Sequence, residues 1–102
     1  MSDIYSIEEI RSVVAPIAQK YDVDRVYLFG SYARGEATIA SDLDFMIDKG
    51  RLRGLMLAGM LGDLQESFNK NVDLITSSSL AENSRSSFKQ DVKEELVVVY
   101  EQ

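Results

Sequence analysis

The spacing of apolar residues changes several times along the chain, and each spacing predicts a different element. From Ile7 onward, apolar residues recur every three or four positions, as they do on one face of a helix. Ser6 and Glu9 form a capping-box pattern at the start of this helix. Pro16 falls inside the pattern and lacks a backbone donor, so we expect a kink or a new short turn just before it. Strands are predicted where short apolar runs stand between polar residues, at 25–29, 43–47, 71–75 and 96–100.

A second long helix is predicted between residues 51 and 68. Its apolar positions follow helical spacing and comprise Leu52, Leu55, Met56, Met60, Leu61, Leu64 and Phe68. We expect this stripe to pack in the core. Glycines also occur within the segment, at Gly54, Gly59 and Gly62. Each weakens a helix by up to ~1 kcal/mol relative to alanine, and close helix–sheet packing would explain their presence.

Two further helices complete the predicted order of elements. A very short one is expected at 32–34, and a polar one from about 80 to 95, with Arg85 and Lys89 in solvent. Helices and strands then alternate along the chain. This order predicts an α+β fold with one sheet of about four strands and helices mainly on one face. Residues 1–102 are enough for one domain and too few for two.

Three aspartates interrupt the apolar strands. Asp42 and Asp44 alternate with the apolar residues of the strand at 43–47, and Asp73 stands between apolar residues in the strand at 71–75. Because side chains alternate across a strand, a shared apolar face places all three carboxylates on the opposite face. Each aspartate alone is better explained as a solvated or turn residue. The three together predict a cluster, provided that the two strands are neighbours.

Such a cluster needs a cation or a shared proton. Two like charges 4 Å apart repel by ~4 kcal/mol at an effective dielectric constant of about 20. The chain contains no cysteine and no histidine, so a bound metal ion would have only oxygen ligands. Carboxylates that bridge two Mg²⁺ ions are typical of in-line phosphoryl and nucleotidyl transfer.

A phosphate-binding end is predicted where the first strand stops. Gly30 lets the backbone approach a phosphate closely, and Ser31 offers a hydroxyl and an N–H at the start of a short helix. Arg34 is a further candidate, although an ion pair with Glu36 explains it as well. Gly-Ser alone is more often an ordinary strand-to-helix turn. Its spacing of ten residues from Asp-x-Asp favours the site, because that combination arises by chance on the order of once in a thousand such chains.

The charge of the chain limits its partners. A formal net charge of −6 and a pI near 4.5 argue against general nucleic-acid binding, which needs a basic surface. No apolar run approaches the ~20 residues of a membrane span, and we see no signal peptide. We therefore expect a cytoplasmic protein with no membrane contact.

The stretch GSYARGEATIASDLDF, residues 30–45, resembles the signature of the minimal nucleotidyltransferases of the DNA polymerase β-like superfamily. That signature is Gly-Ser, about ten residues, Asp-x-Asp and a later aspartate on a strand. The matching positions are Gly30, Ser31, Asp42, Asp44 and Asp73. The resemblance extends to KYDVDRVYLFGS and EELVVVYE and so covers nearly the whole chain.

The resemblance implies a palm-like fold with a mixed sheet, ATP as the nucleoside triphosphate substrate, and two Mg²⁺ ions. Asp42 and Asp44 would hold both ions, and Asp73 would hold one and help activate the acceptor hydroxyl. Gly30 and Ser31 would hold the β- and γ-phosphates.

Stand-alone chains of this length resemble the antitoxin half of HEPN/MNT toxin–antitoxin modules, in which MntA-like members transfer AMP to a tyrosine of a helical HEPN toxin. That resemblance makes a HEPN toxin the expected partner. Two alternatives stay open. The chain could neutralise its toxin by binding alone, although a pure binder has no reason to keep three mutually repelling aspartates. Asp-x-Asp is also a glycosyltransferase metal motif, but such enzymes are longer, and that function leaves Gly-Ser unexplained.

Overall fold

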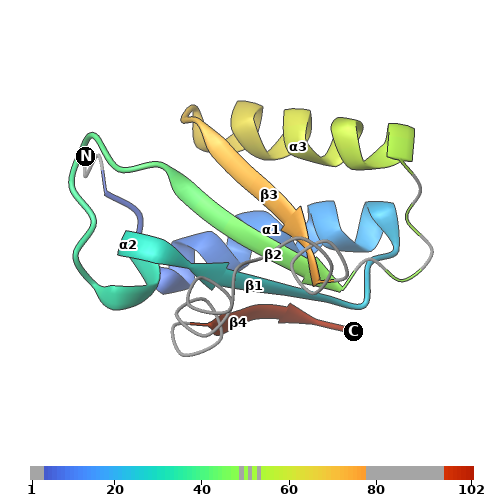
Figure 1. The fold of residues 1–102 in the computed structure, drawn as a ribbon, viewed down its shortest axis with the longest axis horizontal. Helices are drawn as coiled ribbons and strands as arrows, with labels where there is room; N and C mark the ends of the chain where they lie inside the picture. Colours follow the sequence, from blue (N-terminus) through green and yellow to red (C-terminus); the bar gives the residue numbers. More distant parts are fainter. Residues whose placement is uncertain (1–3, 49, 51, 53, 78–95) are drawn as a thin grey trace.

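The computed structural model describes residues 4–48, 50, 52, 54–77 and 96–102. Its elements follow the chain from blue to red in Figure 1. They are α1 (Ile7–Tyr21), β1 (Arg25–Phe29), α2 (Gly30–Arg34), β2 (Leu43–Asp48), α3 (Gly54–Phe68), β3 (Val72–Thr76) and β4 (Val97–Glu101). The predicted strands are confirmed, with ends that differ by at most one residue. The predicted helix at 80–95, with Arg85 and Lys89, lies outside the described residues.

The four strands form one mixed sheet in the order β3-β2-β1-β4. β1 pairs antiparallel with both β2 and β4, whereas β2 and β3 run parallel. The parallel pair follows from its connection, because α3 carries the chain back to the end of the sheet where β2 began. The start of β3 therefore lies beside the start of β2 (Figure 1).

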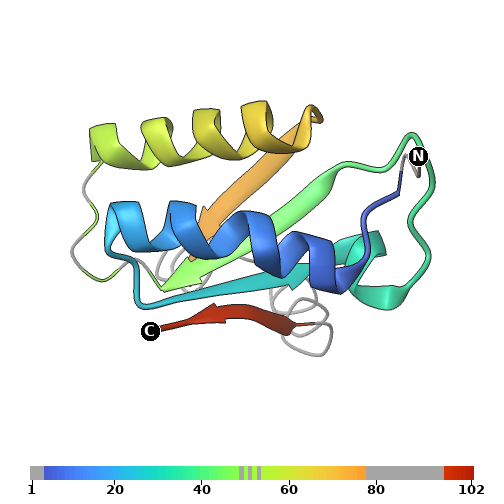
Figure 2. The same ribbon diagram turned by 180° about the vertical axis from the view of Figure 1, so that it is seen from behind.

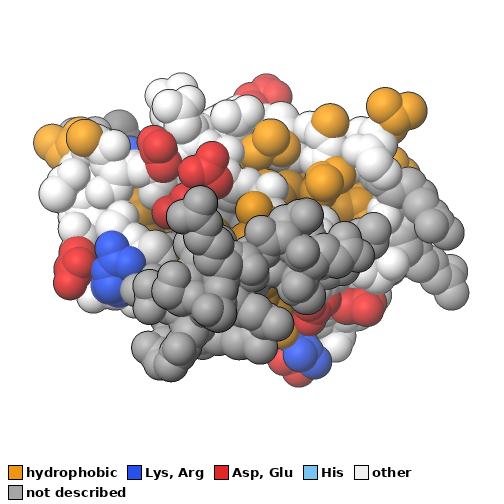
Figure 3. Space-filling model, viewed as in Figure 1, with side chains coloured by type: hydrophobic (Ala, Val, Ile, Leu, Met, Phe, Trp, Pro, Cys, Tyr) orange, Lys and Arg blue, Asp and Glu red, His pale blue; other side chains and the backbone are white. Residues whose placement is uncertain are grey.

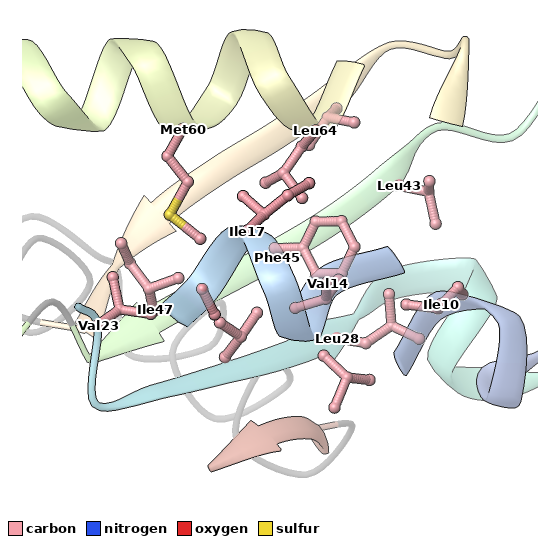
Figure 4. Close-up of a cluster of buried hydrophobic side chains, with 14 of the residues drawn as sticks. Ile10, Val14, Ile17, Val23, Leu28, Leu43, Phe45, Ile47, Met60 and Leu64 are labelled. Atoms are coloured by element: carbon pink, nitrogen blue, oxygen red, sulfur yellow. The ribbon is translucent and has the colours of Figure 1, made fainter. Parts of the chain in front are cut away.

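Helices α1 and α3 cover one face of this sheet, as the view from behind shows (Figure 2). The hydrophobic core lies between them and the strands (Figure 4). Its fully buried members include Ile10 and Val14 from α1, Phe45 from β2, and Met60 and Leu64 from α3. The expected α+β fold with helices on one face is confirmed.

Helix α1 begins with the predicted capping box. The Ser6 hydroxyl accepts a hydrogen bond from the Glu9 amide at 3.1 Å, and the Glu9 carboxylate accepts one from the Ser6 amide at 2.9 Å. The helix continues through Pro16 as a single element up to Tyr21. A separate short turn before Pro16, one of the two expected outcomes, is therefore wrong. Buried residues on both sides of the proline, Val14 and Ile17 among them, hold the two halves against the same core.

Helix α3 begins at Gly54 rather than at residue 51, and its apolar stripe is only partly buried. Met60 is fully buried, as expected, but Leu55 is 93% exposed and Met56 is 48% exposed. The prediction of a fully buried stripe is wrong here because the first turn of α3 extends past the edge of the core.

The glycines of α3 have different surroundings. A Cβ on Gly59 would lie 3.0 Å from the Tyr21 hydroxyl, so this glycine permits close packing of α3 on α1. Gly54 and Gly62 face open space, and close packing does not explain them. In the described part of the chain, no helix has the length and apolar content needed to span a bilayer.

Candidate active site

Asp44 and Asp73 lie side by side on the two parallel strands. Their Cα atoms are register partners, and the neighbouring pair Phe45 and Leu74 packs on the core side of the sheet. The two carboxylates therefore share the opposite face, as the alternation of side chains predicted. Asp42 is exposed just before β2, two residues from Asp44. Figure 3 shows acidic side chains gathered on this face where β2 and β3 begin.

The electrostatics of Asp44 show that the carboxylates are close. Burial, together with a hydrogen bond to Asp73 and the negative charges of Asp73 and Asp42, raises the pKa of Asp44 from 3.8 to about 6. The nearby positive charge of Arg34 acts in the opposite direction and lowers this pKa. The half-buried Asp44 is therefore the centre of the cluster, and its ionised form is destabilised by its neighbours.

Gly30 brings the end of β1 into contact with this cluster. Phe29 is the register partner of Asp44, and Gly30 follows it with a φ of +75°, a backbone conformation that favours glycine. A Cβ atom built on Gly30 would overlap the Asp44 carboxylate. The Gly-Ser turn and the Asp-x-Asp motif, eleven or more residues apart in sequence, therefore meet directly.

The remaining residues of the Gly-Ser turn belong to helix α2. Tyr32 is buried in the core and anchors this short helix. The neighbouring Ser31 is partly buried, and its carbonyl accepts a hydrogen bond from the Glu36 amide at 2.9 Å. The Arg34 guanidinium forms an ion pair with the Glu36 carboxylate at 3.1 Å while its charge still reaches Asp44.

The side chains of Asp42, Asp44 and Asp73 offer only carboxylate oxygens, which are the ligands that Mg²⁺ prefers. Gly30 leaves no room for a side chain beside Asp44, which keeps that carboxylate next to the backbone of the turn. Within the described residues, no group of three or more acidic side chains is already arranged to hold a metal ion. Asp44 and Asp73 form the preorganised pair, and Asp42 lies on the loop beside it.

Sequence reasoning missed the contact that ties down this loop. The Lys70 ammonium, just ahead of β3, donates a hydrogen bond of 2.9 Å to the carbonyl of Ile39. A lysine between a helix and a strand carries no motif, so no sequence signal identified it.

Comparison with known proteins decides the family. The family described as "Nucleotidyltransferase domain" matches residues 8–99, which include both strands of the carboxylate pair and the Gly-Ser turn. The chain belongs to this family. The prediction of a nucleotidyltransferase is therefore confirmed, and the glycosyltransferase alternative is excluded.

Curated relatives of this nucleotidyltransferase come from archaea. A protein of Methanocaldococcus jannaschii named "Putative protein adenylyltransferase MJ0435" is 37% identical over 74% of this chain and 82% of its own length. "Protein adenylyltransferase MntA" of Thermococcus cleftensis is 31% identical over 92% of this chain and 96% of its own. The resemblance to MntA-like members of the family is confirmed.

Solved structures share the fold. The one described as "Structure of putative minimal nucleotidyltransferase" superimposes with a TM-score of 0.72 at 27% identity and covers 91% of this chain and 95% of that one. Another, "Crystal structure of the toxin-antitoxin with AMP-PNP", has a TM-score of 0.71 at 20% identity, with 90% and 73% covered. The fold of this chain is therefore that of the minimal nucleotidyltransferases.

Proposed function

We propose that this protein is a Mg²⁺-dependent adenylyltransferase that transfers AMP from ATP to a tyrosine hydroxyl of a HEPN toxin and thereby acts as its antitoxin. The observation that carries the proposal is the pairing of Asp44 with Asp73 on parallel strands, with Gly30 in contact with Asp44. The names of the relatives, which are protein adenylyltransferases, support AMP as the transferred group and a protein as the acceptor. We propose that residues 1–102 form a single nucleotidyltransferase domain.

The proposed roles follow the positions of the residues. Asp42 and Asp44 would hold both Mg²⁺ ions and Asp73 would hold one, which would neutralise the charge of the triphosphate and orient it for in-line displacement. The Gly30 and Ser31 backbone would receive the β- and γ-phosphates, because Gly30 lies against the Asp44 carboxylate that would hold the ions. Arg34 would bind a phosphate oxygen in exchange for its exposed carboxylate partner, Glu36.

The transfer itself is a displacement at the α-phosphorus. The acceptor oxygen forms a bond to phosphorus as the bond to the β-phosphate oxygen breaks, and pyrophosphate leaves. Asp73 would take up the acceptor proton, which suits a carboxylate that is exposed on the face of the sheet opposite the core. Asp44 would hold both ions in its ionised form, and we assign it no part in the proton transfer.

The identity of the acceptor protein rests on separate support. A solved toxin–antitoxin complex with AMP-PNP shares this fold, which supports a toxin as the partner. A HEPN toxin and its tyrosine are inferred from the resemblance of residues 30–45 to MntA-like antitoxins. Neutralisation by binding alone is the competing function.

One experiment distinguishes AMP transfer to the toxin from neutralisation by binding alone. The purified protein is incubated with ATP, Mg²⁺ and the product of the adjacent gene, which we expect to be the toxin, and the intact mass of each chain is measured. We expect the toxin to gain one or more AMP units, and Asp44→Asn to abolish the gain while the two proteins still associate. A stable complex in which neither mass changes would refute AMP transfer and support binding alone. Asp48→Asn, the same substitution at the far end of β2, serves as the matched control.

A further inference from the structure

The loop that carries Asp42 has little packing of its own. It connects α2 to β2 over residues 35–42, and Thr38, Ile39 and Ala40 are exposed at its tip. One local turn orders it: the Thr38 amide donates to the Ser41 hydroxyl at 2.8 Å, and the Ser41 amide donates to the Thr38 carbonyl at 3.0 Å. A segment with so few buried apolar contacts opens easily unless something outside it holds it.

Two hydrogen bonds to residues just before β3 hold this loop in place. The Lys70 ammonium donates to the Ile39 carbonyl at 2.9 Å, and the Leu43 amide donates to the Asn71 carbonyl at 3.2 Å. These contacts lie on either side of Asp42 in the sequence. They tie its loop to the strand that carries Asp73, only three residues beyond Lys70.

Electrostatic repulsion among the carboxylates explains why the Asp42 loop needs the hydrogen bond from Lys70. The charges of Asp42 and Asp73 both act on Asp44, and Asp42 is the member that stands on a loop rather than in a strand. Repulsion therefore moves Asp42 outward more easily than the other two. A hydrogen bond from a charged ammonium is stronger than a neutral one, and Lys70 uses it to hold the loop tip in place.

We propose that Lys70 is a positioning residue for nucleotidyl transfer, because its hydrogen bond to the Ile39 carbonyl holds the Asp42 loop against the strand that carries Asp73. The inference rests on the proposed function for its effect on catalysis. The hydrogen bond then keeps the Asp42 loop beside the Asp44–Asp73 pair in the free protein, before Mg-ATP binds. Without the tie, nucleotide binding must also order the loop, which weakens affinity and leaves the rate at saturation nearly unchanged.

The test compares Lys70→Met, which keeps the length of the side chain and removes the donor, with Lys70→Arg, which restores a donor. Lys20→Met is the matched control, because it removes the same charge from a lysine that bonds Asp63 between α1 and α3, away from the site. We expect Lys70→Met to raise the Kd and KM for Mg-ATP about fivefold with kcat changed less than about twofold, as for the loss of one hydrogen bond. Lys70→Arg and Lys20→Met should stay within about twofold of the parent protein.

A second measurement needs no nucleotide. Backbone ¹⁵N relaxation of the free protein should show lower order parameters at residues 38–42 in Lys70→Met and parent-like values in Lys70→Arg. Unchanged order parameters would overturn the proposal, because any loss of affinity would then reflect direct contact of Lys70 with phosphate. An unchanged Kd would overturn it too. If the loop and the Kd respond as expected but the parent protein transfers no AMP, the proposed function fails and the positioning of the loop stands.

Discussion

Asp44 and Asp73 are register partners on parallel strands, and the proximity of Asp73 helps to raise the pKa of Asp44 to about 6. A domain of this size has only modest stability to spare, so a pair of unneutralised carboxylates on adjacent strands is a cost to the free protein. A cation and a nucleotide remove that cost when they bind. The arrangement therefore couples the stability of the domain to its ligands, and this coupling can be measured.

Loss of the central carboxylate should abolish transfer without unfolding the protein. We expect Asp44→Asn to lower AMP transfer by about 100-fold or more, because a group that stabilises the reacting phosphate is removed. Circular dichroism should show an unchanged fold, since Asp44 faces away from the main core. Asp48→Asn, on the same face of the same strand, should keep activity within a few-fold. Transfer by a purified Asp44→Asn protein would contradict the assigned role.

The raised pKa of Asp44 predicts a pH dependence of stability in the presence of a chelator. Folding raises this pKa from 3.8 to about 6, so the folded protein holds the proton more tightly than the unfolded chain. The resulting stabilisation is present below about pH 4 and is lost as the pH rises through about 6. Because the group is half exposed, we expect a loss of about 1 kcal/mol in the free energy of unfolding.

The measurement is urea unfolding from pH 4 to 7.5 of the parent protein and Asp44→Asn. The variant cannot ionise at this position, so the difference between the two proteins isolates Asp44. That difference should grow in favour of the variant up to about pH 6 and then level off. A difference that is constant with pH would mean that Asp44 titrates at its ordinary value.

Gly30 should be intolerant of any side chain. Gly30→Ala places a Cβ onto the Asp44 carboxylate at a residue with a φ of +75°, and we expect a destabilisation of about 2–3 kcal/mol with loss of ATP binding. Gly35→Ala is the control, because Gly35 has a φ of +74° but faces open space. It should cost only about 1 kcal/mol and retain binding. Equal losses in thermal and urea unfolding would show that contact with Asp44 is unimportant.

Mg-ATP should stabilise the protein by binding its folded form. At a free ligand concentration ten times the Kd, the expected gain in unfolding free energy is about 1.4 kcal/mol. In a domain of about 100 residues this raises the Tm by several degrees. Differential scanning fluorimetry with ATP and Mg²⁺, and with ATP and a chelator, checks the metal requirement. The double variant Asp44→Asn/Asp73→Asn should show no shift in either condition, and a full shift with the chelator would argue against a metal-dependent site.

Local sequence was sufficient for most of the elements. The strand at 25–29 is observed with the predicted bounds, and the capping box of Ser6 and Glu9 starts α1 as expected. Each of these depends on neighbours within a few positions, through side-chain alternation or a cap. The buried stripe of α3 failed at Leu55, because where a helix leaves the core depends on the position of the sheet and not on the helix's own period.

Some features of the candidate site follow from the local sequence, and others follow from the tertiary structure. The sequence by itself determined the residue types, the Gly-Ser to Asp-x-Asp spacing, and the face of the strand on which Asp44 stands, because each of these is set by the covalent chain and its two-residue alternation. Only the tertiary structure decided that β2 and β3 are parallel neighbours in the register that pairs Asp44 with Asp73, that Gly30 lies against Asp44, and that Lys70 reaches Ile39. Strand order and register arise from packing α1 and α3 on the sheet, and these long-range contacts join residues that no local pattern connects.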